Sequence, residues 1–298
     1  MITKVKKILV ILLALVCVFS LCSCGEKAKK EESTKKEEKG EEKKVEKAGK
    51  WLVQKTVDEF GDEVEDGDTV VQATFTGKFS NSATNGSDLK ATVFVLHNRY
   101  SNVGFVAAIR LEEYGDSPAT YTSNEAKNLK LKCKVDDTVT EYDLESRQNN
   151  GDLYVGTEDM SGDADYIMAN LARGKDVKCY IKIGNSEYNF TIEPDNMHEA
   201  FKEAWGRDDT ETLPYLVDYE WISDKNSNEK LYFYSYDLGY YLVGDSFYAF
   251  AWEYSGDGMK LYMDVLNQHA RVQVDIDEQA GTMKSESGAT YTRGDKVK

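Results

Sequence analysis

Hydrophobic and polar residues alternate along much of the chain beyond residue 50, which is the pattern of half-buried β-strands. In Leu129–Val135 and again in Val177–Ile183, apolar positions are separated by lysine or tyrosine. The turn Gly184–Ser186 predicts a hairpin with the strand that follows. We predict strands in this region over 51–56, 70–79, 91–96, 103–112, 129–135, 152–156, 177–183 and 187–192.

Two segments have the periodicity of amphipathic helices instead. Residues 163–173 place Ile167, Met168 and Leu171 on one side, and residues 196–205 carry an apolar stripe after Asp195, which we expect to cap the helix. The stretch 80–88 is rich in Ser, Asn, Thr and Gly and predicts an ordered turn, with a ligand-binding loop as the alternative. Residues 51–206 are therefore predicted to form a mostly β domain, a β-sandwich with two short helices.

Residues 207–298 show a second pattern, in which short aromatic-rich strands alternate with turns of a few residues. Strands are predicted over 216–222, 230–236, 240–243, 247–254, 259–266, 270–277, 282–284 and 289–292. This spacing favours an antiparallel β-meander or a small barrel. Trp221, the repeated hairpins and the closing Tyr291–Arg293 are similar to small lipocalin-like domains of bacterial lipoproteins.

Aromatic residues form two rows in this second domain. Tyr232, Tyr234 and Tyr236 share one face of a strand, and Phe250 and Trp252 share a face of another. If the tyrosine row is exposed, it offers a flat amphipathic ligand surface for a glycan, peptide or protein. The alternative is that both rows pack into the core, and the burial of the tyrosines decides between the two.

The first residues follow a different pattern. An unbroken apolar run, Ile8–Phe19, lies between three lysines and the sequence Leu21–Gly25. It is shorter than the roughly 20 residues that a membrane-spanning helix needs, so we interpret residues 1–23 as a signal peptide. Leu21, Ser23 and Cys24 resemble the lipobox of bacterial lipoprotein signal peptides.

The lipobox resemblance implies a lipid anchor. Cleavage after Ser23 would leave Cys24 carrying a diacylglyceryl group with palmitate-type chains, which would hold the protein on the outer face of the bacterial cytoplasmic membrane. The alternatives are secretory cleavage after Ser20 or Ser23 without lipid, and Cys22 as the acceptor. Residues 24–50 hold ten Lys and eight Glu and little that is apolar, so we expect a disordered tether.

Charge and motifs exclude several classes of function. Residues 1–50 contribute +5 to the chain's net charge of −16, which leaves −21 on residues 51–298. Such an acidic surface repels phosphate backbones, so no nucleic-acid partner is expected. No cofactor motif occurs, and His97, His198 and His269 have no partners at metal-ligand spacing.

Cysteines and acidic clusters provide the remaining candidate sites. Cys133 and Cys179 fall at inward positions of predicted strands, where they form either a disulfide or two buried thiols. Asp159, Asp163 and Asp165 match the early ligands of a calcium loop, although the glycine and the closing glutamate of that loop are absent. A solvated acidic loop at a helix N-terminus is the alternative.

Two hypotheses for function follow. The favoured one is a membrane-anchored lipoprotein of the cell envelope that binds a ligand or partner without catalysis, such as an envelope glycan or protein. The alternative is an envelope enzyme or enzyme accessory that hydrolyses wall glycans with carboxylates. Two facing acids about 5–9.5 Å apart in a cleft would favour the enzyme.

Overall fold

The computed structural model describes residues 50–64, 67–97, 105–118, 129–146, 151–156, 163–206, 215–244, 246–254, 260–265 and 270–297, with the backbone alone at 254, 260–265 and 270–272. The predicted signal peptide, Cys24 and the tether up to residue 49 lie outside these residues. Ala48–Lys298 forms one compact unit. No helix among the described residues has the length and apolar character required to cross a membrane.

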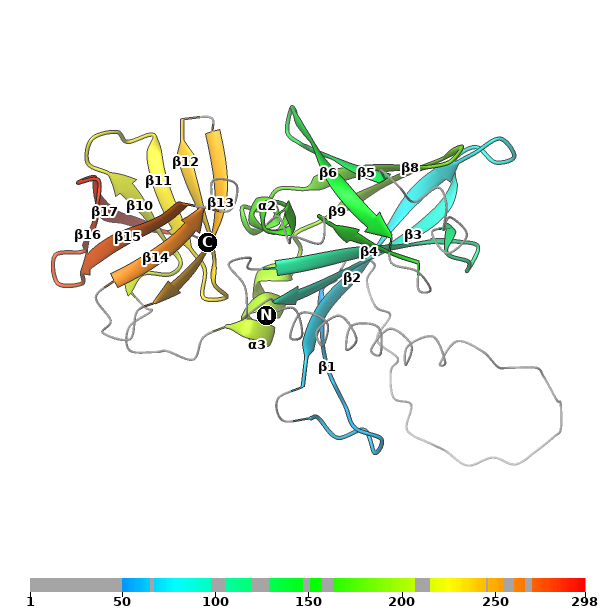
Figure 1. The fold of residues 1–298 in the computed structure, drawn as a ribbon, viewed down its shortest axis with the longest axis horizontal. Coiled ribbons are helices and arrows are strands. Elements are labelled where there is room, and N and C mark those ends of the chain that lie inside the picture. The colour runs from blue at the N-terminus through cyan, green and yellow to red at the C-terminus, as the bar shows by residue number, and fades with distance from the viewer. Residues whose placement is uncertain are drawn as a thin grey trace, which may run out of the picture. The chain divides into compact units, whose positions relative to one another are not determined.

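The first part of this unit is one strongly curved antiparallel sheet, a half-barrel (Figure 1). The strand order is β1-β2-β3-β4-β7-β6-β5-β8-β9, and β9 also pairs with the end of β2. The strands are β1 (Leu52–Lys55), β2 (Thr69–Ser80), β3 (Ser87–His97), β4 (Phe105–Glu113), β5 (Leu129–Val135), β6 (Thr138–Ser146), β7 (Asp152–Val155), β8 (Val177–Ile183) and β9 (Ser186–Ile192).

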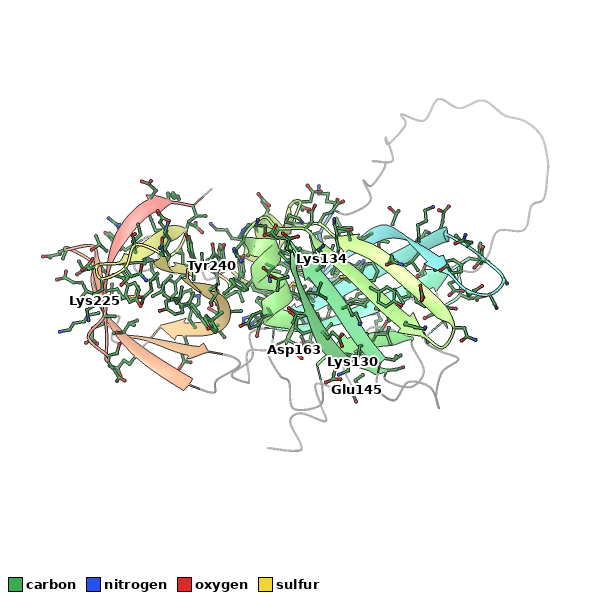
Figure 2. All side chains as sticks on the ribbon, turned by 90° about the horizontal axis from the view of Figure 1, so that it is seen from above. Lys130, Lys134, Glu145, Asp163, Lys225 and Tyr240 are labelled. Carbon is green, nitrogen blue, oxygen red and sulfur yellow. The ribbon has the colours of Figure 1, made fainter. Side chains whose placement is uncertain are left out.

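Alternation along these strands separates a buried concave face from a charged outer face. In β5 the buried positions alternate with exposed lysines, and Lys130 and Lys134 lie along this strand in Figure 2. On the outer face, Lys130 pairs with Asp143 and Lys132 with Glu141 across β5 and β6. Within the described residues the predicted strands of this region are confirmed, and so are the inward apolar positions of Leu129–Val135 and Val177–Ile183.

The mostly β class is confirmed but the predicted β-sandwich is not, because these strands form one curved sheet and helices pack into its core. These helices are α2 (Asp163–Ala172) and α3 (Met197–Trp205), and both were expected at these positions. Ile167 and Phe201 belong to the same buried cluster as Val71 and Phe75 of β2. Alternation predicts that a strand has one buried face, but it does not say whether a sheet or a helix covers that face.

Two local predictions also need correction. Strand β6 was not predicted, because its first four positions are exposed and Tyr142 and Leu144 are its only fully buried residues. Asp195 does not cap α3, whose N-cap residue is Asn196. The Asn196 side chain instead accepts a hydrogen bond from Trp51 N at 2.8 Å and donates one to Trp51 O at 2.9 Å.

The second part is a closed antiparallel barrel in which β10 pairs with β17. It confirms the small-barrel form of the prediction. Its strands are β10 (Tyr219–Ser223), β11 (Glu229–Phe233), β12 (Leu238–Val243), β13 (Ser246–Tyr254), β14 (Lys260–Val265), β15 (Ala270–Asp277), β16 (Thr282–Ser285) and β17 (Thr290–Lys296). Each of the eight corresponds to a predicted strand, because a closed up-and-down meander needs only short turns between neighbours.

The interior of the barrel is filled by large side chains. Trp221, Phe233, Phe250 and Trp252 belong to one buried cluster. The Trp221 indole donates to Leu216 O at 3.0 Å, so its polar group is satisfied inside an apolar core. Phe250 and Trp252 are buried in this interior, so the row that they form is the one that fills the barrel.

Gly77 permits the pairing of β2 with β9 that curls the sheet. A Cβ added at this position would lie 2.3 Å from Asn189 O and 2.9 Å from Phe190 Cβ. We therefore expect Gly77→Ala to lower the free energy of unfolding by about 1–3 kcal/mol, because the two backbones must separate. Urea unfolding followed by tryptophan fluorescence measures this.

Gly86→Ala serves as the control, because its Cβ would meet nothing within 4 Å and its only cost is a positive φ of 69°. We expect a loss of about 1 kcal/mol or less for this variant. An equal loss in the two variants would show that crowding against β9 does not limit position 77.

Candidate functional site

The predicted ligand surface on Tyr232, Tyr234 and Tyr236 is wrong, because these side chains are only 9%, 4% and 2% exposed. They belong to the buried cluster that contains α2 and α3, while Phe250 and Trp252 lie in the separate cluster of the barrel interior. The tyrosines thus lie outside the barrel core, as the alternation predicts, but helices of the same chain cover them. The pattern of a strand does not reveal such a cover.

Polar contacts at the end of α2 hold this cover in place. Tyr234 Oη donates to Ala172 O at 3.1 Å, and His198 Nε2 lies 2.8 Å from the same carbonyl oxygen. Since a carbonyl accepts, His198 Nε2 donates to it, and Nδ1 forms a hydrogen bond of 2.8 Å with Tyr236 Oη. These bonds satisfy a carbonyl that the helix terminus leaves without an intrahelical partner.

Arg173 and Tyr166 add contacts on the same side of the barrel. The Arg173 guanidinium lies 5.5 Å from the ring centre of Tyr240 and 4.5 Å from that of Phe247. Tyr166 Oη donates to Phe247 O at 3.1 Å. Tyr240 is labelled in Figure 2. This aromatic face is therefore an internal interface of the protein.

The other predicted site residues do not converge. Cys133 and Cys179 are directly opposite in β5 and β8, and both are buried with their Sγ atoms 3.9 Å apart. Asp165 is buried in α2 and Asp163 is half-buried, while Asp159 lies outside the described residues. Within the described ranges, no group of three His, Cys, Asp or Glu is placed to hold a metal ion.

The histidines also lie apart. His97 Nε2 lies 3.5 Å from Asp237 Oδ2, and His198 forms the helix contacts described above. His269 falls outside the described residues. The two described histidines therefore have structural partners and share no site.

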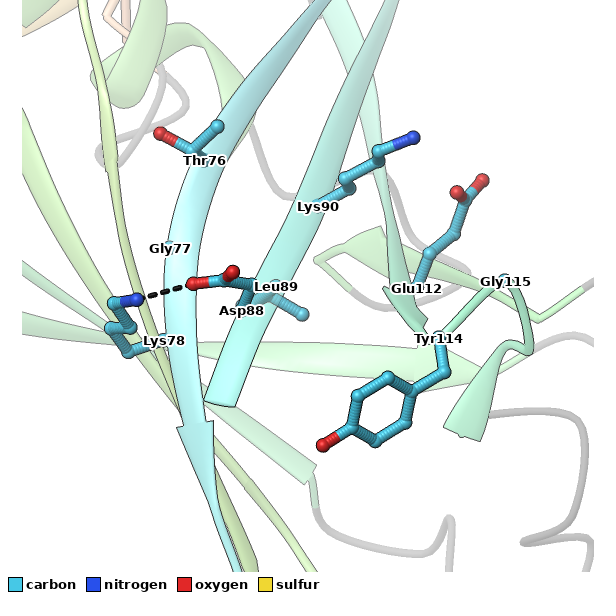
Figure 3. A pocket seen from close by; sticks show the side chains of 9 residues that line it. All are labelled: Thr76, Gly77, Lys78, Asp88, Leu89, Lys90, Glu112, Tyr114 and Gly115. Carbon is cyan, nitrogen blue, oxygen red and sulfur yellow. Dashed lines mark hydrogen bonds and ion pairs between the residues drawn. The ribbon is translucent and has the colours of Figure 1, made fainter. Parts of the chain in front are cut away.

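A hollow of about 730 Å³ lies on the outer face of β2, β3 and β4. Figure 3 shows Lys78 joined to Asp88 across β2 and β3. Lys90 and Glu112, which are opposite each other in β3 and β4, point to the same side. The hollow is lined by Thr76, Gly77, Lys78, Asp88, Leu89, Lys90, Glu112, Tyr114 and Gly115.

Tyr114 borders this hollow from a strained turn. Glu113 and Asp116 exchange two backbone hydrogen bonds of 2.8 Å, so Tyr114 and Gly115 form a two-residue turn. Their φ angles of 52° and 93° are both positive, a geometry in which Asn and Gly are the common residues. A tyrosine in the left-handed region costs roughly 1–2 kcal/mol.

The ring of Tyr114 is exposed although its position is fixed. It is 77% exposed, packs edge-on against Phe79 with ring centres 5.6 Å apart, and donates through Oη to Ser87 Oγ at 3.0 Å. The exposed part of the ring therefore lies at the edge of the hollow, and Figure 3 shows the ring directed away from Lys90 and Glu112. Tyr114 was not predicted as a site residue; its signal is the pair Tyr114-Gly115, one residue beyond the predicted strand 103–112.

Charge in the hollow is arranged in opposite pairs. The hydrogen bond and charge of Lys78 hold the pKa of Asp88 below its ordinary value. Asp88 therefore stays ionised at neutral pH, which suits a hydrogen-bond acceptor and not a general acid. The hollow therefore has hydrogen-bond donors and acceptors along its strands and an aromatic ring at its edge.

The buried tyrosines predict a loss of stability at high pH. Burial raises the pKa of Tyr234 and of Tyr236. The folded protein thus keeps phenol protons that the unfolded chain releases above about pH 10. We expect the contribution of these tyrosines to the free energy of unfolding to be constant up to about pH 10 and to fall as the pH rises further.

Urea midpoints between pH 8 and pH 12 measure this effect. Tyr234→Phe should lose about 1 kcal/mol at pH 8, because the bond to Ala172 O is absent, and should fall less steeply above pH 10. Tyr215→Phe is the control, since this tyrosine is 41% exposed. Identical alkaline profiles for the parent and Tyr234→Phe would contradict the assignment.

Comparisons with known proteins found no match to this chain. No protein-family model matches the chain, and no curated protein or solved structure matches it. The candidate functional site is therefore assigned from geometry and chemistry, and it is the hollow bordered by Tyr114 on the outer face of the half-barrel.

Proposed function

We propose that the protein is a lipid-anchored lipoprotein of the bacterial cell envelope that binds glycan at the hollow beside Tyr114. The observation that carries the binding part is the Tyr114 ring itself. It is 77% exposed on a backbone that is costly for a tyrosine. Residues with such strained backbone angles cluster at active sites and ligand-binding sites, where the surrounding structure holds them in place.

The chemistry of the hollow matches that of a sugar. A pyranose ring has an apolar face of C–H groups, which stacks on an aromatic ring, and a rim of hydroxyls that both donate and accept hydrogen bonds. Tyr114 supplies the aromatic face, Lys90 a donor and Glu112 an acceptor. The open shape favours a chain of sugars over a small enclosed ligand.

Hydrolysis of the glycan is the alternative within the same site. A glycosidase needs one carboxylic acid whose pKa is raised so that it can protonate the leaving group. Lys78 shifts the pKa of Asp88 in the opposite direction. Binding without cleavage is therefore the better-supported proposal for these residues.

The binding site is tested with the unit 48–298 and chitotetraose as a soluble stand-in for wall glycan, followed by NMR titration. Tyr114→Asn removes the ring and places a residue that tolerates positive φ in the turn. We expect at least a tenfold weaker affinity, about 1.4 kcal/mol, while the free energy of unfolding changes by less than about 1 kcal/mol.

Phe60→Asn is the matched control, because Phe60 is 82% exposed and does not line the hollow. It should bind chitotetraose as the parent does. Equal weakening in the two variants would rule out the hollow as the glycan site. If the hollow bound an envelope peptide and not the glycan, the proposal of a glycan ligand would be overturned.

The anchor is tested separately in cells. Cys24→Ser should move the protein from the membrane fraction to the soluble fraction, because the proposed acceptor of the diacyl group is absent. Cys22→Ser is the control and should stay in the membrane fraction. Release by Cys22→Ser alone would reassign the acceptor, and an unlipidated mature N-terminus in the parent would overturn the anchor.

A further inference from the structure

Cys133 and Cys179 form a pair inside the half-barrel that the proposed glycan site does not use. They are directly opposite each other in the antiparallel strands β5 and β8. Their side chains are 4% and 3% exposed, and their Sγ atoms lie 3.9 Å apart. The chain between them contains β6, β7 and α2, so the two strands are neighbours in space but distant in sequence.

The backbone already has the separation that a disulfide needs. Directly opposite residues of an antiparallel pair have Cα atoms about 4.5–5.5 Å apart, which falls inside the 4.4–6.8 Å range of disulfides. Rotation of the side chains is then the main movement required. Cys179 Sγ now donates to Val177 O at 3.6 Å, a weak bond that can be given up.

We propose that Cys133 and Cys179 form an intrachain disulfide during folding outside the cytoplasm, before β5 and β8 close. This proposal rests on the extracytoplasmic location of the proposed function. The two cysteine thiols lose two protons and two electrons in this step. A disulfide of the glutathione or thiol-oxidoreductase class accepts these protons and electrons and is thereby reduced to two thiols. The first cysteine thiolate attacks the oxidant's disulfide and releases one oxidant thiol. The second cysteine thiolate attacks the resulting mixed disulfide at the first cysteine's sulfur, which forms the intrachain bond and releases the second oxidant thiol.

Burial determines when this exchange can take place. The attacking species is a thiolate, and burial raises the pKa of Cys179 far above its ordinary value. A bulky oxidant also cannot reach a thiol that is 3% exposed. The folded sheet therefore resists oxidation, and once the bond has formed the same burial resists its reduction.

Refolding under two regimes tests the order of events. Residues 24–298 with Cys24→Ser are produced reduced, so that Cys133 and Cys179 are the cysteines that remain. One sample is unfolded in urea and refolded with oxidised glutathione, and the other receives oxidised glutathione after folding. Thiols are then alkylated in denaturant and counted by intact mass.

We expect the refolded sample to lose both thiols and the folded sample to oxidise at least 100-fold more slowly. Two alkylated thiols after refolding, or glutathione adducts that never resolve, would overturn the disulfide. Equal rates in both samples would overturn the folding-coupled order.

Stability and cellular state give a second, independent measurement. The oxidised parent should melt on the order of 10 °C above the reduced parent, and Cys133→Ala should show no such dependence on reductant. Alkylation of cells before lysis reports the state of the native protein. Reduced cysteines in an envelope-located protein would refute the disulfide alone, whereas a cytoplasmic protein would refute the proposed location.

Discussion

The burial of α2 and α3 on two sides is the constraint on which the rest of the structure depends. A helix on the surface of a protein hides a stripe of little more than 100°. In α2 seven of ten residues are buried, because the helix covers the concave sheet and also meets the aromatic outer face of the barrel. The buried cluster is therefore continuous from the half-barrel through the helices to the tyrosines of the barrel. Without the helices, the apolar face of the curved sheet and the aromatic face of the barrel would both be exposed to solvent.

Strand positions could be predicted because each strand exposes one face and buries the other, as in Leu129–Val135. Strand β6 was missed where polar residues occupy its first positions, and the cover on Tyr232, Tyr234 and Tyr236 was missed because it comes from helices far away in the sequence. Tyr114 was missed for a different reason. Its importance lies in a backbone angle and in the shape around it, which period-two patterns do not encode.

The outer face of the half-barrel carries many opposite charges, and most of them contribute little to stability. Pairs such as Lys130–Asp143 and Lys182–Glu187 lie at the surface, where water and salt screen them. They keep the curved sheet soluble and leave its acidic excess facing the solvent. At the hollow the same kind of charge pair, Lys78–Asp88, lines a concave surface that is bordered by the exposed ring of Tyr114.

The two hydrogen bonds between Asn196 and the backbone of Trp51 affect how the unit responds to mechanical force. A pull on the chain from its N-terminal side reaches Trp51 first, where Asn196 binds both backbone polar groups and the buried indole donates to Glu193 O at 3.0 Å. The force is thus shared among three hydrogen bonds and a fully enclosed ring before it can peel β1 from β2. Separation of β1 from β2, starting at this end, therefore requires the contacts of Trp51 to break first.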